Sequence, residues 1–331
     1  MVKVIRNAAT ILFSVVTIIN VVIFFYRDKF IYHKYATQSS LYSSGTLKWK
    51  KIVYNYPQQE LSEARIILDS LAHFKDKSTI SKVLEIGQLL YKRFYRQRGI
   101  PSSVVSGATP LNKFKVLSSS DSAQLWCGDF ASMFAFFCCA EGIPSRCIEL
   151  INMGSHHVLN ESYVSETGAW VLTDLMYNRL LLWDKTNDRY ENVLHLRDSM
   201  PGTLMSLQAT DSAVIARPFS SGYYDRFFGN KNPIYYYYQL NLSEVYKPTE
   251  KIKRYVLPFA WYEEVKQGTK GNLPFYSKQF FILLWLTCFA FLMKKIIRPK
   301  KSDYYENFLQ RSYFIHDGVY ASKKEKSNIF W

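Results

Sequence analysis

The fold is decided by residues 124–174. Residues 124–150 read QLWCGDFASMFAFFCCAEGIPSRCIEL, and residues 156–174 read HHVLNESYVSETGAWVLTD. Three reactive side chains stand at the boundaries of otherwise apolar segments. Cys127 opens a helix-like run, His157 opens a strand-like run, and Asp174 closes the next strand-like run. This placement makes the three side chains candidates for one site.

The run that begins at Cys127 has no helix breaker before Gly142 and Pro144, which predicts a helix over residues 127–140. Asp121 and Ser122 are its candidate caps. The free N–H groups and the dipole at a helix start favour a thiolate and can stabilise an oxyanion. A lone cysteine on an apolar helix is more often a small buried side chain, and that is the interpretation for Cys138 and Cys139.

A thiol nucleophile needs a base, and an imidazole can supply one near neutral pH. His156 and His157 are adjacent, so in a strand they face opposite sides, and alternation does not settle which one faces Cys127. A turn at residues 166–168 and a strand at residues 169–173 predict a hairpin that brings Asp174 back to the histidines. A carboxylate in that place can orient an imidazole.

The order and spacing of these residues resemble those of the transglutaminase-like superfamily, whose members are relatives of papain-type thiol enzymes. The matching residues are Cys127, the segment GIPSR at 142–146, His157 with Glu161, and Gly168, Trp170 and Asp174. The resemblance implies an α+β fold, with helices packed on a small antiparallel sheet. It implies Cys127 as nucleophile, His157 as base and Asp174 as the residue that orients it, without cofactor or metal. It selects His157 over His156, because only His157 places Glu161 at the matching offset.

Some residues depart from the pattern of that superfamily. Gly128 and Asp129 follow the cysteine, and Asp129 places a negative charge near the expected thiolate. Leu175 stands after Asp174, where proline is frequent. Gln124 and Trp126 are candidate donors to an oxyanion, and Glu161 is a candidate supporting residue.

Composition limits the function classes. The chain has 331 residues, 48% of them hydrophobic, and a formal net charge of +15. The positive charge is dispersed and gathers beside hydrophobic spans, which favours a membrane surface over nucleic acid. No pair among the five cysteines has CxxC spacing, which argues against a zinc ribbon. A bridge from Cys147 to Cys138 or Cys139 is an alternative to their burial as free thiols.

Two apolar segments predict membrane helices. Residues 8–25 carry no charge, and YRDK follows them, which is unlike a signal-peptidase site. We therefore expect a signal anchor over residues 1–30 rather than a cleaved signal peptide. Residues 273–297 form the second expected span, followed by a cluster of lysines and Arg298. A buried core helix is the alternative for this segment. Both termini would then lie in the cytosol.

The remaining organisation follows from these spans. We expect a stalk at residues 31–57, a transglutaminase-like domain at residues 58–272 and a basic cytosolic tail at residues 298–331. Helical spacing appears at 60–74 and 79–98, and residues 102–121 read as a loop. A strand is expected at residues 180–183. The aromatic groups at 223–228 and 235–238 suit a core or membrane interface, and less often stack on sugars.

The sequence predicts a membrane-anchored thiol enzyme in the cytoplasmic (inner) membrane, with its domain on the extracytoplasmic or periplasmic side. Its reaction would be acyl transfer or amide hydrolysis through a thioester on Cys127. Its partners would be the lipid bilayer, an extracytoplasmic protein, peptide or glycan substrate, and envelope-assembly proteins. The rival interpretation is a non-catalytic scaffold or binding protein of envelope or polysaccharide assembly that retains the fold.

Overall fold

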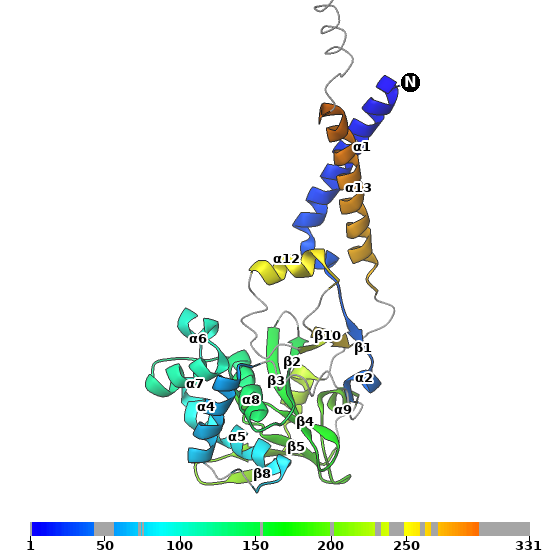
Figure 1. Ribbon diagram of the computed structural model, residues 1–331. Coiled ribbons are helices and arrows are strands. Elements are labelled where there is room, and N and C mark those ends of the chain that lie inside the picture. The colour runs from blue at the N-terminus through cyan, green and yellow to red at the C-terminus, as the bar shows by residue number, and fades with distance from the viewer. Residues whose placement is uncertain are drawn as a thin grey trace, which may run out of the picture. The chain divides into compact units, whose positions relative to one another are not determined.

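The structure is a computed structural model that describes residues 2–42, 56–71, 74, 76–152, 155–198, 202–228, 233–237, 248–258, 262–265 and 271–297. The chain divides into two units. One comprises Met1–Phe30 and Leu273–Trp331, and the other Ile31–Asn272. The predicted basic tail at residues 298–331 lies outside the described residues. The fold is mixed α+β, as the sequence predicts (Figure 1).

The unit Ile31–Asn272 is built on a sheet whose last two strands position two of the predicted site residues. His157 lies on one of these strands, and Asp174 follows the other. The order of the sheet is β1 (Tyr35–Ala36), β10 (Tyr262–Val265), β9 (Ile234–Tyr237), β2 (Ser145–Asn152), β3 (Ser155–Val164) and β4 (Ala169–Thr173). β1 runs parallel to β10, and the other neighbours are antiparallel. Asn160 lies opposite Thr173, so Asp174 follows β4 close to the start of β3.

Helix α8 (Cys127–Ala140) packs against β2 and β3 and forms the centre of the core. Residues 129–140 are all buried, and a helix that is apolar on every side is stable only in such a place. Gly142 adopts a left-handed φ of 74° and ends the helix. Its N–H donates to the Cys139 carbonyl at 3.0 Å, and the Ile143 N–H donates to the Cys138 carbonyl at 2.9 Å. Both predicted ends of this helix are confirmed.

The helices before α8 pack around it on one side of the sheet (Figure 1). They are α4 (Gln58–Leu71), α5 (Thr79–Phe94), the 3-10 turn η3 (Tyr95–Gln97), α6 (Ser103–Gly107) and α7 (Pro110–Ser119). The prediction of a loop over residues 102–121 is therefore wrong. Thr109 caps α7 and Pro110 fills its first position. Leu111, Phe114 and Leu117 are buried at a helical spacing that the Ser, Gly and Pro content obscured.

A second, antiparallel sheet follows the first along the chain. Its order is β6 (Arg189–Tyr190), β5 (Leu181–Asp184), β7 (Leu204–Ala209) and β8 (Val214–Pro218), and β5 matches the predicted strand at 180–183. The 3-10 turn η4 (Leu175–Tyr177) joins the two sheets. Among its described residues, this unit also contains α9 (Val193–Asp198), α10 (Ser221–Phe227) and α12 (Pro248–Val256).

The aromatic segments at 223–228 and 235–237 belong to the core. Tyr223, Phe227, Phe228, Tyr236 and Tyr237 are all buried. This outcome agrees with the interpretation of these segments as core residues and removes these side chains from any exposed sugar-stacking surface. Tyr238 lies outside the described residues.

The predicted stalk at residues 31–57 is wrong for its first part. β1 pairs with β10, and α2 (Gln38–Tyr42) follows it. Leu41 is fully buried, and its carbonyl accepts a 2.8 Å hydrogen bond from Arg146 Nη1. The segment lacks the apolar periodicity of a core element. It is held to the domain by the pairing of β1 with β10 and by the buried Leu41. Residues 43–55 lie outside the described residues.

The unit with both termini contains the two predicted spans, in α1 (Val2–Phe25) and α13 (Leu273–Ile297). Both helices are long and apolar enough to cross a membrane, and little of either is buried within the protein, unlike a core helix. They contact each other through Phe13 and Trp285, whose ring centroids are 5.5 Å apart. The polar groups in the contact are paired, since Trp285 Nε1 donates to Thr17 Oγ1 at 2.9 Å and Asn20 Nδ2 donates to the Phe281 carbonyl at 3.2 Å. The short turn η1 (Arg27–Phe30) follows α1.

Candidate active site

Cys127 is the first residue of α8 and is partly exposed. A short backbone ladder fixes the chain that leads into it. The Leu125 N–H donates to the Gln97 carbonyl at 2.9 Å, and the Gly99 N–H donates to the Leu125 carbonyl at 3.1 Å. The thiol is therefore held at the position where the first N–H groups of a helix have no intrahelical partner.

Asp129 shapes the start of α8 in a way that differs from the predicted capping by Asp121 or Ser122. Trp126 occupies the capping position, and its N–H donates to Asp129 Oδ2 at 3.0 Å. Asp129 Oδ1 is 2.5 Å from Nζ of Lys113, and both side chains are buried. The lysine offsets the negative charge that the sequence placed near the thiol. A partner 16 residues earlier in the chain gave no local signal for this ion pair.

His157 lies between the two other predicted residues of the triad. Its Nε2 is 2.6 Å from Asp174 Oδ2, and the sulfur of Cys127 lies close enough to interact electrostatically with its ring. His157 is 4% exposed and Asp174 is 1% exposed. Backbone hydrogen bonds of 2.7 Å in both directions between Asp174 and Arg179 hold the carboxylate at the end of β4. The structure therefore brings together three side chains from positions up to 47 residues apart in the sequence.

The protonation of His157 follows from these contacts. Burial alone disfavours the charged imidazolium, but the negative charge of Asp174 and its hydrogen bond outweigh burial. The interaction with Cys127 acts in the same direction. Together they raise the pKa of His157 to about 10. The imidazolium form is therefore favoured at neutral pH, as a thiolate–imidazolium pair requires.

His156 and His157 face opposite sides of β3. The side chain of His156 is 58% exposed, and its Nδ1 is 2.7 Å from Glu149 Oε1. The hydroxyl of Tyr237 donates to the other oxygen of Glu149. Only His157 reaches Asp174, so the structure separates the two histidines in the way that the offset to Glu161 indicated.

Tyr223 is a further member of the site that the sequence did not reveal. Its hydroxyl donates to Asp174 Oδ2, the oxygen that also contacts His157. Burial, followed by the charge of Asp174, raises the pKa of Tyr223 well above its usual value, so it remains a proton donor. The neighbouring Phe227 ring lies 4.5 Å from the His157 ring, centroid to centroid. α10 thus closes over the His157–Asp174 pair, although its sequence shows only an aromatic cluster.

Replacing Tyr223 with phenylalanine tests this contact. The ring packing survives while one donor to Asp174 is lost, and we expect acylation of Cys127 by p-nitrophenyl acetate to slow about tenfold. The measurement is the rate of p-nitrophenol release by the full-length protein in detergent micelles. Tyr224→Phe is the matched control, because in the described part of the chain the Tyr224 hydroxyl has no hydrogen bond. Equal rates in the two variants would show that Tyr223 only fills space.

Glu161 lies in the core and supports the sheet. Its Oε2 accepts from Arg146 Nε at 3.0 Å and Nη2 at 2.6 Å. Its Oε1 accepts from Tyr42 Oη at 2.7 Å and from the Val193 N–H at 2.7 Å. The guanidinium of Arg146 also lies 3.9 Å from the centroid of Trp170. These contacts occupy the Glu161 carboxylate and give it a structural role rather than an oxyanion contact.

Gln124 and Trp126, the two candidate oxyanion donors, lie three residues and one residue before Cys127. Gln124 packs against Gly99, where an added Cβ would lie 2.6 Å from its amide. The N–H of Trp126 is already used by Asp129, so it is not a free donor to an oxyanion. The indole of Trp126 is 51% exposed. The backbone N–H groups of the first turn remain the natural donors.

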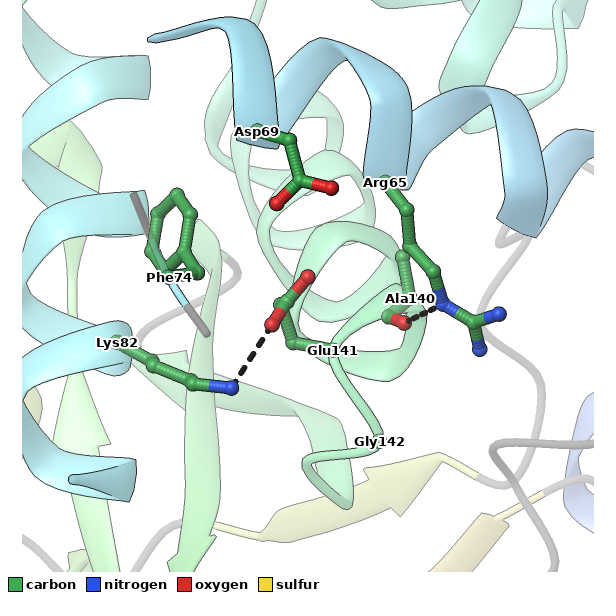
Figure 2. Close-up of a pocket in the computed structure, with 7 residues that line it drawn as sticks. All are labelled: Arg65, Asp69, Phe74, Lys82, Ala140, Glu141 and Gly142. Atoms are coloured by element: carbon green, nitrogen blue, oxygen red, sulfur yellow. Dashed lines mark hydrogen bonds and ion pairs between the residues drawn. The ribbon is translucent and has the colours of Figure 1, made fainter. Parts of the chain in front are cut away.

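A hollow of about 550 Å³ lies at the other end of α8. Figure 2 shows its lining: Arg65, Asp69, Phe74, Lys82, Ala140, Glu141 and Gly142. Arg65 Nε donates to the Ala140 carbonyl at 2.5 Å, and Lys82 Nζ lies 3.0 Å from Glu141 Oε2. These contacts satisfy the last turn of the helix. None of the predicted site residues lines this hollow.

Comparison with known proteins adds little to this geometry. No protein-family model matches the chain, and no curated protein matches it. One solved structure, described as a "Putative Cysteine Protease" from Cytophaga hutchinsonii, is similar with 22% identity and a TM-score of 0.27. The similarity covers 36% of this chain and 38% of the other. A TM-score this low carries no weight, so the chemistry of the site rests on its own residues.

Proposed function

We propose that the protein is a membrane-anchored thiol enzyme of the transglutaminase-like type, which acts outside the cytoplasmic membrane by acyl transfer or amide hydrolysis. One observation carries the proposal: the buried ring of His157 lies 2.6 Å from Asp174 Oδ2 and interacts electrostatically with the sulfur of Cys127. A nucleophile, a base and an orienting carboxylate in this order are the parts that acyl chemistry on a thiol requires.

In the first step, the thiolate of Cys127, paired with the imidazolium of His157, attacks the carbonyl carbon of the substrate. The tetrahedral oxyanion would be stabilised by backbone N–H groups in the first turn of α8. The imidazolium of His157 then donates its proton to the leaving amine, and the C–N bond breaks. The product of this step is a thioester on Cys127 and a free amine.

In the second step, water or an amine attacks the thioester, and His157 takes its proton. The C–S bond breaks, the acid or new amide leaves, and the thiolate–imidazolium pair is restored. Asp174 holds the imidazole in place and stabilises its charged form throughout. Tyr223 keeps the carboxylate oriented towards His157.

Labelling with a small neutral thiol reagent tests the proposal. Iodoacetamide is expected to alkylate Cys127 at pH 7 before the other cysteines. Cys138, Cys139 and Cys147 are buried, and burial raises the pKa of each of these thiols. Peptide mass spectrometry of the full-length protein locates the label.

Cys127→Ala is expected to abolish acylation by p-nitrophenyl acetate and the cellular phenotype of the protein. An unchanged phenotype would favour the scaffold interpretation.

The membrane arrangement needs its own test. Reporter fusions at residue 150 and at the C-terminus are expected to report opposite sides of the membrane. A cytosolic signal at residue 150 would overturn the proposed orientation. The support for two spans is the length and apolar character of α1 and α13.

The raised pKa of His157 predicts how stability depends on pH. The folded-state pKa of about 10 lies above the unfolded value near 6.5, so folding favours the protonated ring. This contribution is fully present below about pH 6.5 and is lost as pH rises through about 10. The advantage in Tm of the wild type over His157→Gln is expected to be largest at pH 6 and to shrink towards pH 10, by about 2–4 °C for each kcal/mol lost. Thermal unfolding followed by circular dichroism measures it. A difference that stays constant with pH would contradict the raised pKa.

A further inference from the structure

Exposed arginines and aromatic rings lie near Cys127 and His157. Trp126, next to the nucleophile, is 51% exposed, and Tyr177 is 36% exposed. The Tyr177 ring stands edge-on to the His157 ring with 5.2 Å between centroids. An exposed aromatic side chain on each side of a reactive pair is suited to hold the chain of a bound substrate.

Arg98 lies beside this reactive pair. Its Nε donates to the Tyr95 carbonyl at 2.8 Å, and its Nη1 donates to the Met176 carbonyl at 3.1 Å. Met176 immediately precedes Tyr177, and Arg98 also forms an isolated backbone bridge with Leu125, two residues before Cys127. These contacts hold the guanidinium beside the site. Its Nη2 has no hydrogen bond with any described residue.

Arg226 lies on the side of α10. Its guanidinium carbon is 5.3 Å from the centroid of Phe227, the ring that packs on His157. Its positive charge also acts on the hydroxyl of Tyr177. Among the described residues, the guanidinium has no ion pair.

We propose that the acyl donor is an acidic peptide, with a carboxylate next to the reacting carbonyl bound by Arg98 and Arg226 and its chain lying on Trp126 and Tyr177. A guanidinium binds a carboxylate through two parallel hydrogen bonds, which gives orientation as well as attraction. Residues 31–272 hold 28 lysines and arginines against 22 aspartates and glutamates, and this excess of positive charge draws such a substrate towards the domain. This assignment rests on the proposed thiol function.

Matched peptide probes test the assignment. Ala-Glu and Ala-Gln chloromethyl ketones differ in one charge beside the electrophile and alkylate the same cysteine. We expect the full-length protein to react about fivefold faster with the Glu probe, a modest preference because both arginines are exposed to water. The ratio of the two second-order rate constants is the readout. It is expected to fall as salt is raised from 50 to 500 mM, because salt screens exposed charges.

Arginine variants locate the preference. Arg98→Gln and Arg226→Gln are each expected to lower the Glu:Gln ratio, and the double variant to bring it to about one. Arg65→Gln is the control with the same loss of charge. Arg65 contacts the last residue of the 14-residue helix α8, about 20 Å from Cys127 along its axis. If Arg65→Gln lowers the Glu:Gln ratio equally, the preference for the Glu probe is an effect of net charge alone, and the assignment is overturned.

Iodoacetamide separates the two proposals. If it labels Cys127 while the Glu:Gln ratio is one in the wild type, the acidic-peptide assignment fails and the thiol function stands. If it does not label Cys127, both fail. Soluble poly-glutamate is expected to protect Cys127 from the probes. Protection by polygalacturonate at equal carboxylate concentration, without protection by poly-glutamate, would replace the peptide with an acidic glycan and overturn the assignment.

Discussion

Asp174→Asn is expected to slow acylation of Cys127 by about 10³–10⁴-fold while the protein stays folded. The asparagine keeps the size of the side chain and removes its charge. That charge and its hydrogen bond are the main reasons why the pKa of His157 is raised to about 10, against the opposing effect of burial. Without the charge, the imidazolium that must balance the thiolate loses its partner.

The rate of p-nitrophenol release from p-nitrophenyl acetate measures this effect. Asp188→Asn is the matched control, because it removes an exposed carboxylate from the turn between β5 and β6. Asp188 has a φ of 46°, which asparagine also tolerates. The control is expected to react at the wild-type rate. If Asp174→Asn reacts within about threefold of the wild type, the carboxylate does not orient the base and the triad assignment fails.

Glu161→Gln is expected to destabilise the protein by about 3–5 kcal/mol, because it leaves the charge of Arg146 buried without a counter-ion. Both side chains are fully buried. Donors from Arg146 face one carboxylate oxygen, and donors from Tyr42 and Val193 face the other. The glutamine NH₂ must therefore point at a donor in either orientation. Each orientation leaves buried groups unpaired.

Thermal unfolding of the full-length protein in detergent measures this loss. Glu63→Gln is the control, because the pair that Glu63 makes with Lys115 is roughly half exposed. Breaking that pair is expected to change the free energy of unfolding by less than about 1 kcal/mol. Equal stability of the two variants would mean that the Arg146–Glu161 pair contributes no more than a surface pair. Because Tyr42 and the Leu41 carbonyl join this cluster, Glu161→Gln is also expected to expose residues near α2 to limited proteolysis.

The geometry of the candidate triad was largely predictable from the sequence. The ends of α8 were marked by Cys127 and Gly142, and β4 was marked by the turn before it. A β-hairpin has little freedom once its turn and register are set, so the carboxylate after β4 had to return to the start of β3. The catalytic roles of these residues remain a prediction.

Other parts of the site gave no local signal. Lys113 and Tyr223 contact Asp129 and Asp174 from elements 16 and 49 residues away. Lys113 stands in a stretch that was predicted to be a loop, and Tyr223 stands in an aromatic cluster that was interpreted as core or membrane interface, with no indication of a contact to Asp174. Long-range ion pairs and hydrogen bonds are set by how elements pack, which no window of sequence contains.

The α+β class was implied by the family resemblance, while the sequence by itself determined the two apolar spans, the ends of the helix that begins at Cys127 and the order of Cys127, His157 and Asp174. These depend on local periodicity, breakers and length, which neighbouring residues carry. The tertiary structure alone decided three other features: Lys113 offsets the charge of Asp129, α10 closes over the His157–Asp174 pair, and residues 35–42 join the domain instead of forming a stalk. Each of these features depends on a contact with a distant segment that buries a charge or pairs an edge strand. Such contacts stabilise the protein only after the chain has packed.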